Sequence, residues 1–217
     1  EAGLEPLADR LFADPTLEPL AEAAAFLNPD AGFADAHAVL DGVRDLLAER
    51  WAEDAALVGR LREWLWEAGF LRSTLAAGKD EANADVAKFR DYFDYREPIA
   101  KVPSHRALAV FRGRALEILD ARLVLDEELA PGQPSLAEGH IAHHLGWRHA
   151  GRPGDELIRK TVAWTWKVKL GLSLERDLFA RLREAAEAVA IKVFAENVRD
   201  LLLAAPAGPR VVMGLDP

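Results

Sequence analysis

The stretch from Lys88 to Arg114 reads KFRDYFDYREPIAKVPSHRALAVFRGR, and its charge differs from that of the rest of the 217-residue chain. It holds seven of the 27 Lys and Arg residues and only three acidic residues, so its net charge is +4 in a chain of net charge −9. Both tyrosines of the chain, Tyr92 and Tyr95, also lie in it. Basic side chains together with aromatic rings are typical of segments that neutralise phosphates and stack on nucleobases.

Prolines divide this stretch, here called the first basic island, into two parts. We expect a helix up to Tyr95, an extended IAKV segment, and a new helix that begins at Pro103, because proline interrupts a helix and is favoured in a first turn. Ser104 and His105 fall in the first turn of the new helix. Free backbone N–H groups in such a turn favour an anion.

The remaining charge is unevenly distributed along the chain. Residues 1–87, 115–147 and 171–217 have net charges of −11, −5 and −1, whereas residues 148–170 have a net charge of +4 and form a second basic island. Basic segments of an acidic protein can still face nucleic acid. The alternative is that nearby carboxylates pair with these side chains and hold helices together, and charge by itself favours this alternative.

The predicted fold class is mainly α: a multi-helical scaffold with one long central helix and a few short strands. Half of the residues are hydrophobic, and apolar residues recur at helical spacing in segments rich in Ala, Leu, Glu and Arg. Alternation of polar and apolar residues indicates the strands. We expect helices within 4–27 (two, separated at Asp14-Pro15), at 33–51, 54–68, after the cap Ser135, at 155–170 with Asp155 as cap, and at 174–204 with Ser173 as cap, and strands at 70–75 and 118–126.

The last of these helices is the longest. At 1.5 Å per residue it spans roughly 45 Å, more than one small domain can bury, so we interpret it as a strut between parts of the protein. Its apolar stripe consists of Leu174, Leu178, Leu182, Ala185, Val189, Val193, Leu201 and Leu202.

Motifs of common enzymes are absent from the sequence, which has no GxSxG, P-loop or GxGxxG pattern and no cysteine. His140 and His144 have the i,i+4 spacing of two metal ligands on a helix, but no carboxylate completes an HExxH motif. We expect these histidines to pack or to lie on the surface. The sequence therefore predicts no enzyme, no metal site and no cofactor.

No run of about 18 uncharged apolar residues occurs, so we predict no membrane span. The absence of cysteine excludes disulfides and is typical of a cytoplasmic protein. The chain starts without Met and ends at GLDP, which suggests a piece of a longer protein.

Three segments carry a resemblance to a known family: FRDYFDYREPIAKVPSHRALAVFRGR, GRPGDELIRKTVAWTWKVKL and REAAEAVAIKVFAENVRDLLLAAPAGPRVVMGLDP. They resemble the central region of Tex, a family of bacterial transcription accessory proteins related to the eukaryotic elongation factor Spt6. The resemblance implies that residues 1–208 are a helical Tex-like central region, with any sub-boundary near 76–87. Residues 209–217 would then be the first strand of a YqgF-type, ribonuclease H-like domain that the sequence cuts short.

In that family, helix-hairpin-helix units and an S1 RNA-binding domain follow this region. The resemblance therefore implies that RNA or DNA is bound mostly through parts outside this chain, and that the transcription machinery is a further expected partner. Asp216 matches an aspartate of the ribonuclease H-like domain. One carboxylate cannot build a two-metal hydrolytic site, so a nuclease fragment is the weakest interpretation.

Two functional hypotheses remain after this comparison. The first is a helical scaffold that orients flanking nucleic-acid-binding domains. The second is a direct, weak nucleic-acid-binding module in the first basic island. Its candidate binding residues are Arg90, Tyr92, Lys101, His105, Arg106, Arg112 and Arg114.

Overall fold

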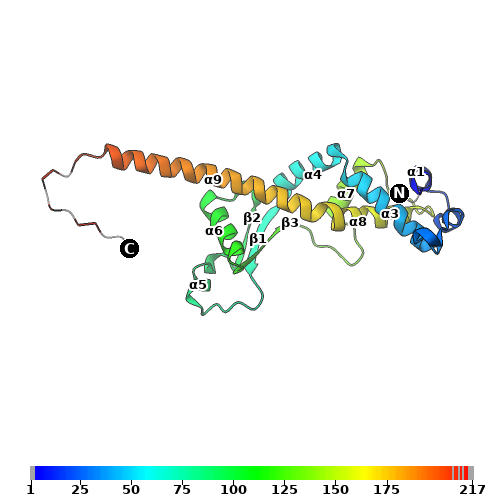
Figure 1. The fold of residues 1–217 in the computed structure, drawn as a ribbon, viewed down its shortest axis with the longest axis horizontal. Coiled ribbons are helices and arrows are strands. Elements are labelled where there is room, and N and C mark those ends of the chain that lie inside the picture. Colours follow the sequence, from blue (N-terminus) through cyan, green and yellow to red (C-terminus); the bar gives the residue numbers. More distant parts are fainter. Residues whose placement is uncertain (1–2, 207, 210, 212, 215–217) are drawn as a thin grey trace.

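The computed structural model describes residues 3–206, 208, 209, 211, 213 and 214. The protein is elongated: the N-terminal helices lie at one end, and the last helix projects from the other (Figure 1). A small sheet lies near the middle, alongside the last helix. Helices make up most of the structure, which confirms the predicted mainly α class.

The N-terminal part is a group of helices, two of which begin at side-chain caps. Asp35 accepts a hydrogen bond of 2.8 Å from the N–H of Ala38, and Asp54 accepts hydrogen bonds from the N–H groups of Ala56 and Leu57. These caps fix where the two helices start, within a few residues of the predicted helices at 33–51 and 54–68. The helices of this part are α1 (Glu5–Ala13), α2 (Pro19–Ala23), α3 (Ala36–Ala52) and α4 (Ala55–Ala68), with 3-10 turns η1 (Ala24–Phe26) and η2 (Pro29–Ala31).

Three antiparallel strands form a sheet in the order β2-β1-β3. β1 (Phe70–Leu75) and β3 (Leu119–Val124) coincide with the two predicted strands. β2 (Asp94–Pro98) pairs with the other edge of β1. The buried Ser73 of β1 donates a hydrogen bond of 2.8 Å to the carbonyl oxygen of Tyr92, which ties the segment before β2 to the sheet.

The sequence prediction was wrong for residues 88–102, where we expected a helix up to Tyr95 and an extended IAKV. Residues 94–98 form an edge strand instead, because strand formation depends on the neighbouring strand more than on intrinsic preference. The IAKV segment contains a 3-10 turn that buries Ile99 completely, and the N–H of Ile99 donates to the carbonyl of Gly69 at 2.9 Å. The elements found here are α5 (Ala84–Ala87), η3 (Arg90–Tyr92), β2 and η4 (Ile99–Lys101).

Two later helices begin where the sequence predicts. α6 (Ser104–Ala115) starts directly after Pro103 and packs against β3 and the last helix. α7 (Leu136–His144) follows Ser135, whose hydroxyl accepts a hydrogen bond of 3.2 Å from the N–H of Glu138.

The final helices differ from the prediction of two separate helices. α8 (Asp155–Trp164), the π-helical segment η5 (Thr165–Leu170) and α9 (Gly171–Leu203) follow one another without a break. Gly171 keeps helical angles (φ −56°, ψ −54°), so the chain does not restart at Ser173. Gly154 holds the cap position of α8, and Asp155 is its first helical residue.

The long helix α9 is buried along only part of its length. Its N-terminal half packs against α6 and α4 and buries Leu174, Leu178, Leu182 and Ala186. Its C-terminal half projects beyond the rest of the protein (orange in Figure 1). The apolar stripe predicted from the sequence is therefore covered only in part, because the described residues provide no element to cover its C-terminal positions. The exposed members of the stripe are Ala185, Val189, Val193, Leu201 and Leu202.

The expected strand at residues 209–217 cannot be compared in full with the structure. Arg210, Val212 and Leu215–Pro217, which include Asp216, lie outside the described residues, so this strand and the proposed domain boundary stay predictions. Within the part of the chain that the structure describes, no helix is both long enough and apolar enough to cross a membrane.

Candidate nucleic-acid interface

The seven candidate residues of the first basic island lie at three places along the chain. One group lies in η3, a second around the start of α6, and a third at the end of α6. Arg106 and Arg114 are eight residues apart on α6, which corresponds to about 12 Å along the helix axis. The three groups are Arg90 and Tyr92, then Lys101, His105 and Arg106, and lastly Arg112 and Arg114.

The group at the start of α6 is partly neutralised by its neighbours. Arg106 lies 3.5 Å from a carboxylate oxygen of Glu97 and 6.0 Å from the ring of Tyr95. The hydroxyl of Tyr95 donates to Glu97, and burial together with this carboxylate raises the pKa of Tyr95. Tyr92 is half-buried and its ring meets that of Tyr95 edge-on, with ring centres 5.5 Å apart. Both rings are thus engaged within the protein.

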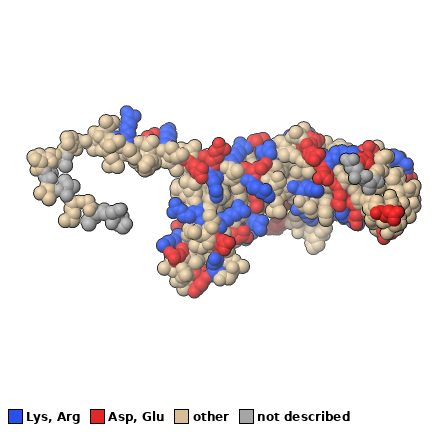
Figure 2. Space-filling model, viewed as in Figure 1, with Lys and Arg blue, Asp and Glu red and all other residues tan. Residues whose placement is uncertain are grey.

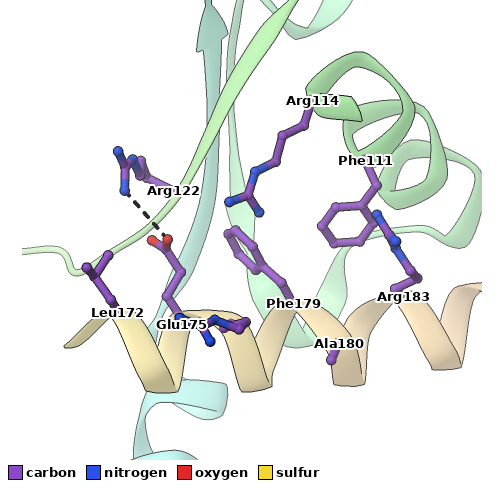
Figure 3. Close-up of a pocket in the computed structure, with 9 residues that line it drawn as sticks. Phe111, Arg114, Arg122, Leu172, Glu175, Phe179, Ala180 and Arg183 are labelled. Carbon is purple, nitrogen blue, oxygen red and sulfur yellow. Dashed lines mark ion pairs between the residues drawn. The ribbon is translucent and has the colours of Figure 1, made fainter. Parts of the chain in front are cut away.

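The end of α6 borders a hollow that also involves β3 and α9 (Figure 3). Its volume is about 390 Å³, and we call it the arginine hollow. Figure 3 shows Arg114 reaching down from α6 towards α9, and Arg183 rising from α9 towards Phe111. Lining residues with charged or aromatic side chains are Phe111, Arg114, Arg122, Glu175, Arg176, Phe179 and Arg183.

Two of these arginines lie over aromatic rings. The guanidinium of Arg114 is 5.4 Å from the ring centre of Phe179, and that of Arg183 is 4.9 Å from the ring centre of Phe111. Both rings are buried, so they form the wall of the hollow and offer no open face to a nucleobase. The contacts hold the two cations in place by cation–π attraction.

Only one carboxylate lines the hollow, and it already has partners. Glu175 lies 3.7 Å from Arg122 and accepts a hydrogen bond of 2.8 Å from the N–H of Leu123. Among the described residues, no carboxylate lies within ion-pair distance of Arg114, Arg176 or Arg183, so the hollow carries excess positive charge. Figure 2 shows several basic side chains over α6, the sheet and the middle of α9, with acidic side chains among them.

Sequence reasoning found Arg114 but missed the other three arginines of the hollow. Arg176, Phe179 and Arg183 have i, i+3, i+7 spacing, which places them on one face of α9. That spacing was a detectable signal. It was hidden because the net charge of residues 171–217 is only −1.

The second basic island is largely paired with acidic residues, as the alternative interpretation of its charge expected. Its ion pairs are Arg152–Asp155, Arg159–Glu156, Lys160–Glu156, Lys167–Glu138 and Lys169–Glu49. Its tryptophans are half-buried, and Arg44 lies 4.0 Å from the ring centre of Trp164. Two of these pairs, Lys167–Glu138 and Lys169–Glu49, join distant elements, and the other three lie within α8 or just before it.

The two histidines with metal-ligand spacing contact other side chains. Nε2 of His144 lies 2.8 Å from a carboxylate oxygen of Asp54, and this hydrogen bond lowers the pKa of Asp54. The ring of His140 lies 4.0 Å from that of Trp64, and burial lowers the pKa of His140. Both contacts hold α7 against α4. Within the described residues, no group of three or more His, Cys, Asp or Glu side chains could hold a metal ion.

These features define a class of protein: an elongated, mainly α protein whose long helix and small sheet carry a basic face. Residues 14–194 match the family model described as Tex central region-like, and the chain belongs to the Tex family. The resemblance found in the sequence is thereby confirmed.

Relatives match over the whole chain. It is 50% identical to Protein YhgF of Escherichia coli, 49% identical to Protein tex of Bordetella pertussis and 45% identical to Transcriptional accessory protein Tex of Neisseria gonorrhoeae. Each alignment covers 100% of this chain and 28% of the relative. The chain thus corresponds to less than a third of each of these proteins. The name of the Neisseria relative describes a transcription accessory protein and no enzymatic activity.

Proposed function

We propose that this chain is the helical scaffold of a Tex-family transcription accessory protein acting in the cytoplasm, where it holds nucleic-acid-binding parts in a fixed arrangement. It has no catalytic role of its own in this proposal. The observation that carries the proposal is the division of α9 into a buried half and an exposed apolar half.

The exposed half of α9 has a clear apolar face. Ile191, Phe194, Leu201 and Leu202 are all strongly exposed and recur at helical spacing, while Lys192 and Glu196 lie on another side. Charged groups are sparse on the projecting helix in Figure 2. Exposed apolar patches of this kind mark interaction surfaces.

This apolar face points away from the side that α9 buries. Leu182 and Ile191 are nine residues apart, about two and a half turns of helix, so their side chains point in opposite directions. One helix can therefore bind the body of this chain on one side and another body on the opposite side. The relatives contain more than two thirds of their length outside the matched segment, and we assign this other body to that remainder.

Trypsin cleavage tests the assignment, because Lys192 and Arg199 lie in the exposed half. We expect rapid cleavage at these residues in the 217-residue chain and protection in a full-length protein that contains it. Phe194→Ser in the full-length protein should restore cleavage, since it removes the largest side chain of the apolar face. Glu196→Gln, on the charged side, should leave the protection intact.

Equal cleavage of the 217-residue chain and the full-length protein would show that nothing covers the apolar face. Equal protection of Phe194→Ser and Glu196→Gln would show that the part of the full-length protein that shields α9 does not contact its apolar face. Either result contradicts the scaffold proposal.

Direct nucleic-acid binding by the first basic island is the second candidate. It is favoured by Arg90, Lys101 and Arg112, which are exposed and form no ion pair among the described residues. Arg106, Lys88 and Arg96 of the same island are paired with Glu97, Asp85 and Asp126. The separation of the candidate residues limits such binding to a few phosphates at a time.

A further inference from the structure

We propose that the arginine hollow between α6, β3 and α9 is a binding site for phosphodiester groups of single-stranded nucleic acid. The site is distinct from the apolar face of α9 and does not depend on the scaffold proposal. Of the residues predicted from the sequence it uses only Arg114. Its other cations come from β3 and α9.

The charge balance of the hollow is the first argument. Of the four arginines that line it, Arg122 pairs with Glu175 and Asp120, and the other three have no carboxylate partner among the described residues. Cations held in a recess repel one another, and an anion there would relieve the repulsion. Arginine suits phosphate oxygens because its planar guanidinium donates two parallel hydrogen bonds.

Preorganisation is the second argument. Arg114 and Arg183 are positioned by Phe179 and Phe111, so little side-chain freedom is lost when a ligand binds. Arg176 and Arg183 are two turns apart on α9, about 10.5 Å along the helix axis. The cations are thus spread along the helix, which fits a chain of repeated charges better than one small anion.

The size and lining of the hollow select the form of nucleic acid. A volume of about 390 Å³ accommodates a nucleotide-sized segment. A flexible single strand can bend its backbone into such a recess, whereas the stiff duplex cannot enter it. The aromatic rings are buried beneath the guanidinium groups, so they leave no stacking surface. Recognition therefore acts on the backbone and is independent of base sequence.

Fluorescence polarisation with a short labelled single-stranded RNA tests the site in the 217-residue chain. The hollow variant is Arg176→Gln/Arg183→Gln, and the matched control is Lys79→Gln/Arg148→Gln, which removes two exposed positive charges outside the hollow and outside the candidate residues of the first basic island. We expect the hollow variant to bind about tenfold more weakly and the control to stay near wild type. The slope of log affinity against log salt should fall by about 0.7 for each phosphate that the hollow variant no longer binds.

Three competitors identify the ligand class. Unlabelled single-stranded RNA should displace the probe, whereas polyglutamate peptide and inorganic phosphate at the same charge concentration should not. Displacement by polyglutamate as effective as that by RNA would assign the hollow to an acidic protein segment and overturn the proposal. Displacement by inorganic phosphate and not by RNA would show that the hollow binds free anions, and this result would also overturn the proposal.

Folding of the variants is checked by their unfolding midpoints. Loss of the cation–π interaction between Arg183 and Phe111 could lower the unfolding midpoint of the double variant. In that case the single variant Arg176→Glu is measured in its place, because the side chain of Arg176 makes no ring contact or ion pair among the described residues. This charge reversal should weaken RNA binding at least as strongly. Equal weakening in a folded hollow variant and in the control would mean that only the overall charge matters, which contradicts a defined site.

Discussion

Leu182→Ala is expected to lower the free energy of unfolding by about 2–5 kcal/mol, the range for truncation of a buried leucine. Leu182 is only 4% exposed and lies in the half of α9 that packs against α6. Removing its side-chain carbons leaves a cavity that the surrounding helices cannot fill. Urea unfolding of the 217-residue chain measures the effect.

The same substitution elsewhere in α9 supplies the control. Leu201 is 77% exposed, so Leu201→Ala should change the free energy of unfolding by no more than about 0.5 kcal/mol. Val193→Ala, at a half-exposed position of the apolar stripe, should behave like Leu201→Ala. Similar destabilisation by Leu182→Ala and Leu201→Ala would show that the projecting half of α9 is covered even in this chain, against the structure.

Asp155→Ala should have the second large effect, about 1.5–3 kcal/mol, because it removes the charged acceptor of several hydrogen bonds. The side chain of Asp155 is 0% exposed. It accepts hydrogen bonds from the guanidinium and N–H of Arg152, from the N–H of Ala150 and from the indole of Trp147. Loss of the carboxylate leaves these partly buried donors without their acceptor.

The same hydrogen bonds predict how stability depends on pH. Arg152 first, and then the N–H and indole donors, hold the pKa of Asp155 well below its usual range. A lowered folded-state pKa contributes stability that is present above the unfolded pKa, about 3.9, and is lost as the pH falls towards the folded value. Wild type should therefore lose stability below about pH 4, and Asp155→Asn should lose less over that range.

Glu156→Gln is the matched control for Asp155. Glu156 is the next residue of α8, but its side chain is half exposed and pairs with Arg159 at the surface. Its replacement should cost at most about 1 kcal/mol. An Asp155→Ala variant as stable as Glu156→Gln would show that the buried network around Asp155 does not hold α8 in place.

The arginine hollow shows why the binding surface was only partly predictable. Arg114, Arg122 and Arg183 come from a helix, a strand and a second helix, and their charges add up only after these elements pack together. A count of charge along the sequence instead singled out Arg106, which Glu97 partly neutralises in the folded protein. Contiguity in the chain and proximity in space are different properties.

Local interactions account for what the sequence by itself determined. The cap Ser135 set the start of α7, and apolar periodicity set the mainly α class, because both depend on residues within one or two turns. Family membership was also readable from three contiguous segments. Only the tertiary structure decided that residues 94–98 form a strand, that α9 is buried to Ala186 and exposed beyond it, and that four arginines share one hollow. These outcomes depend on which distant elements meet, and that is settled by long-range packing.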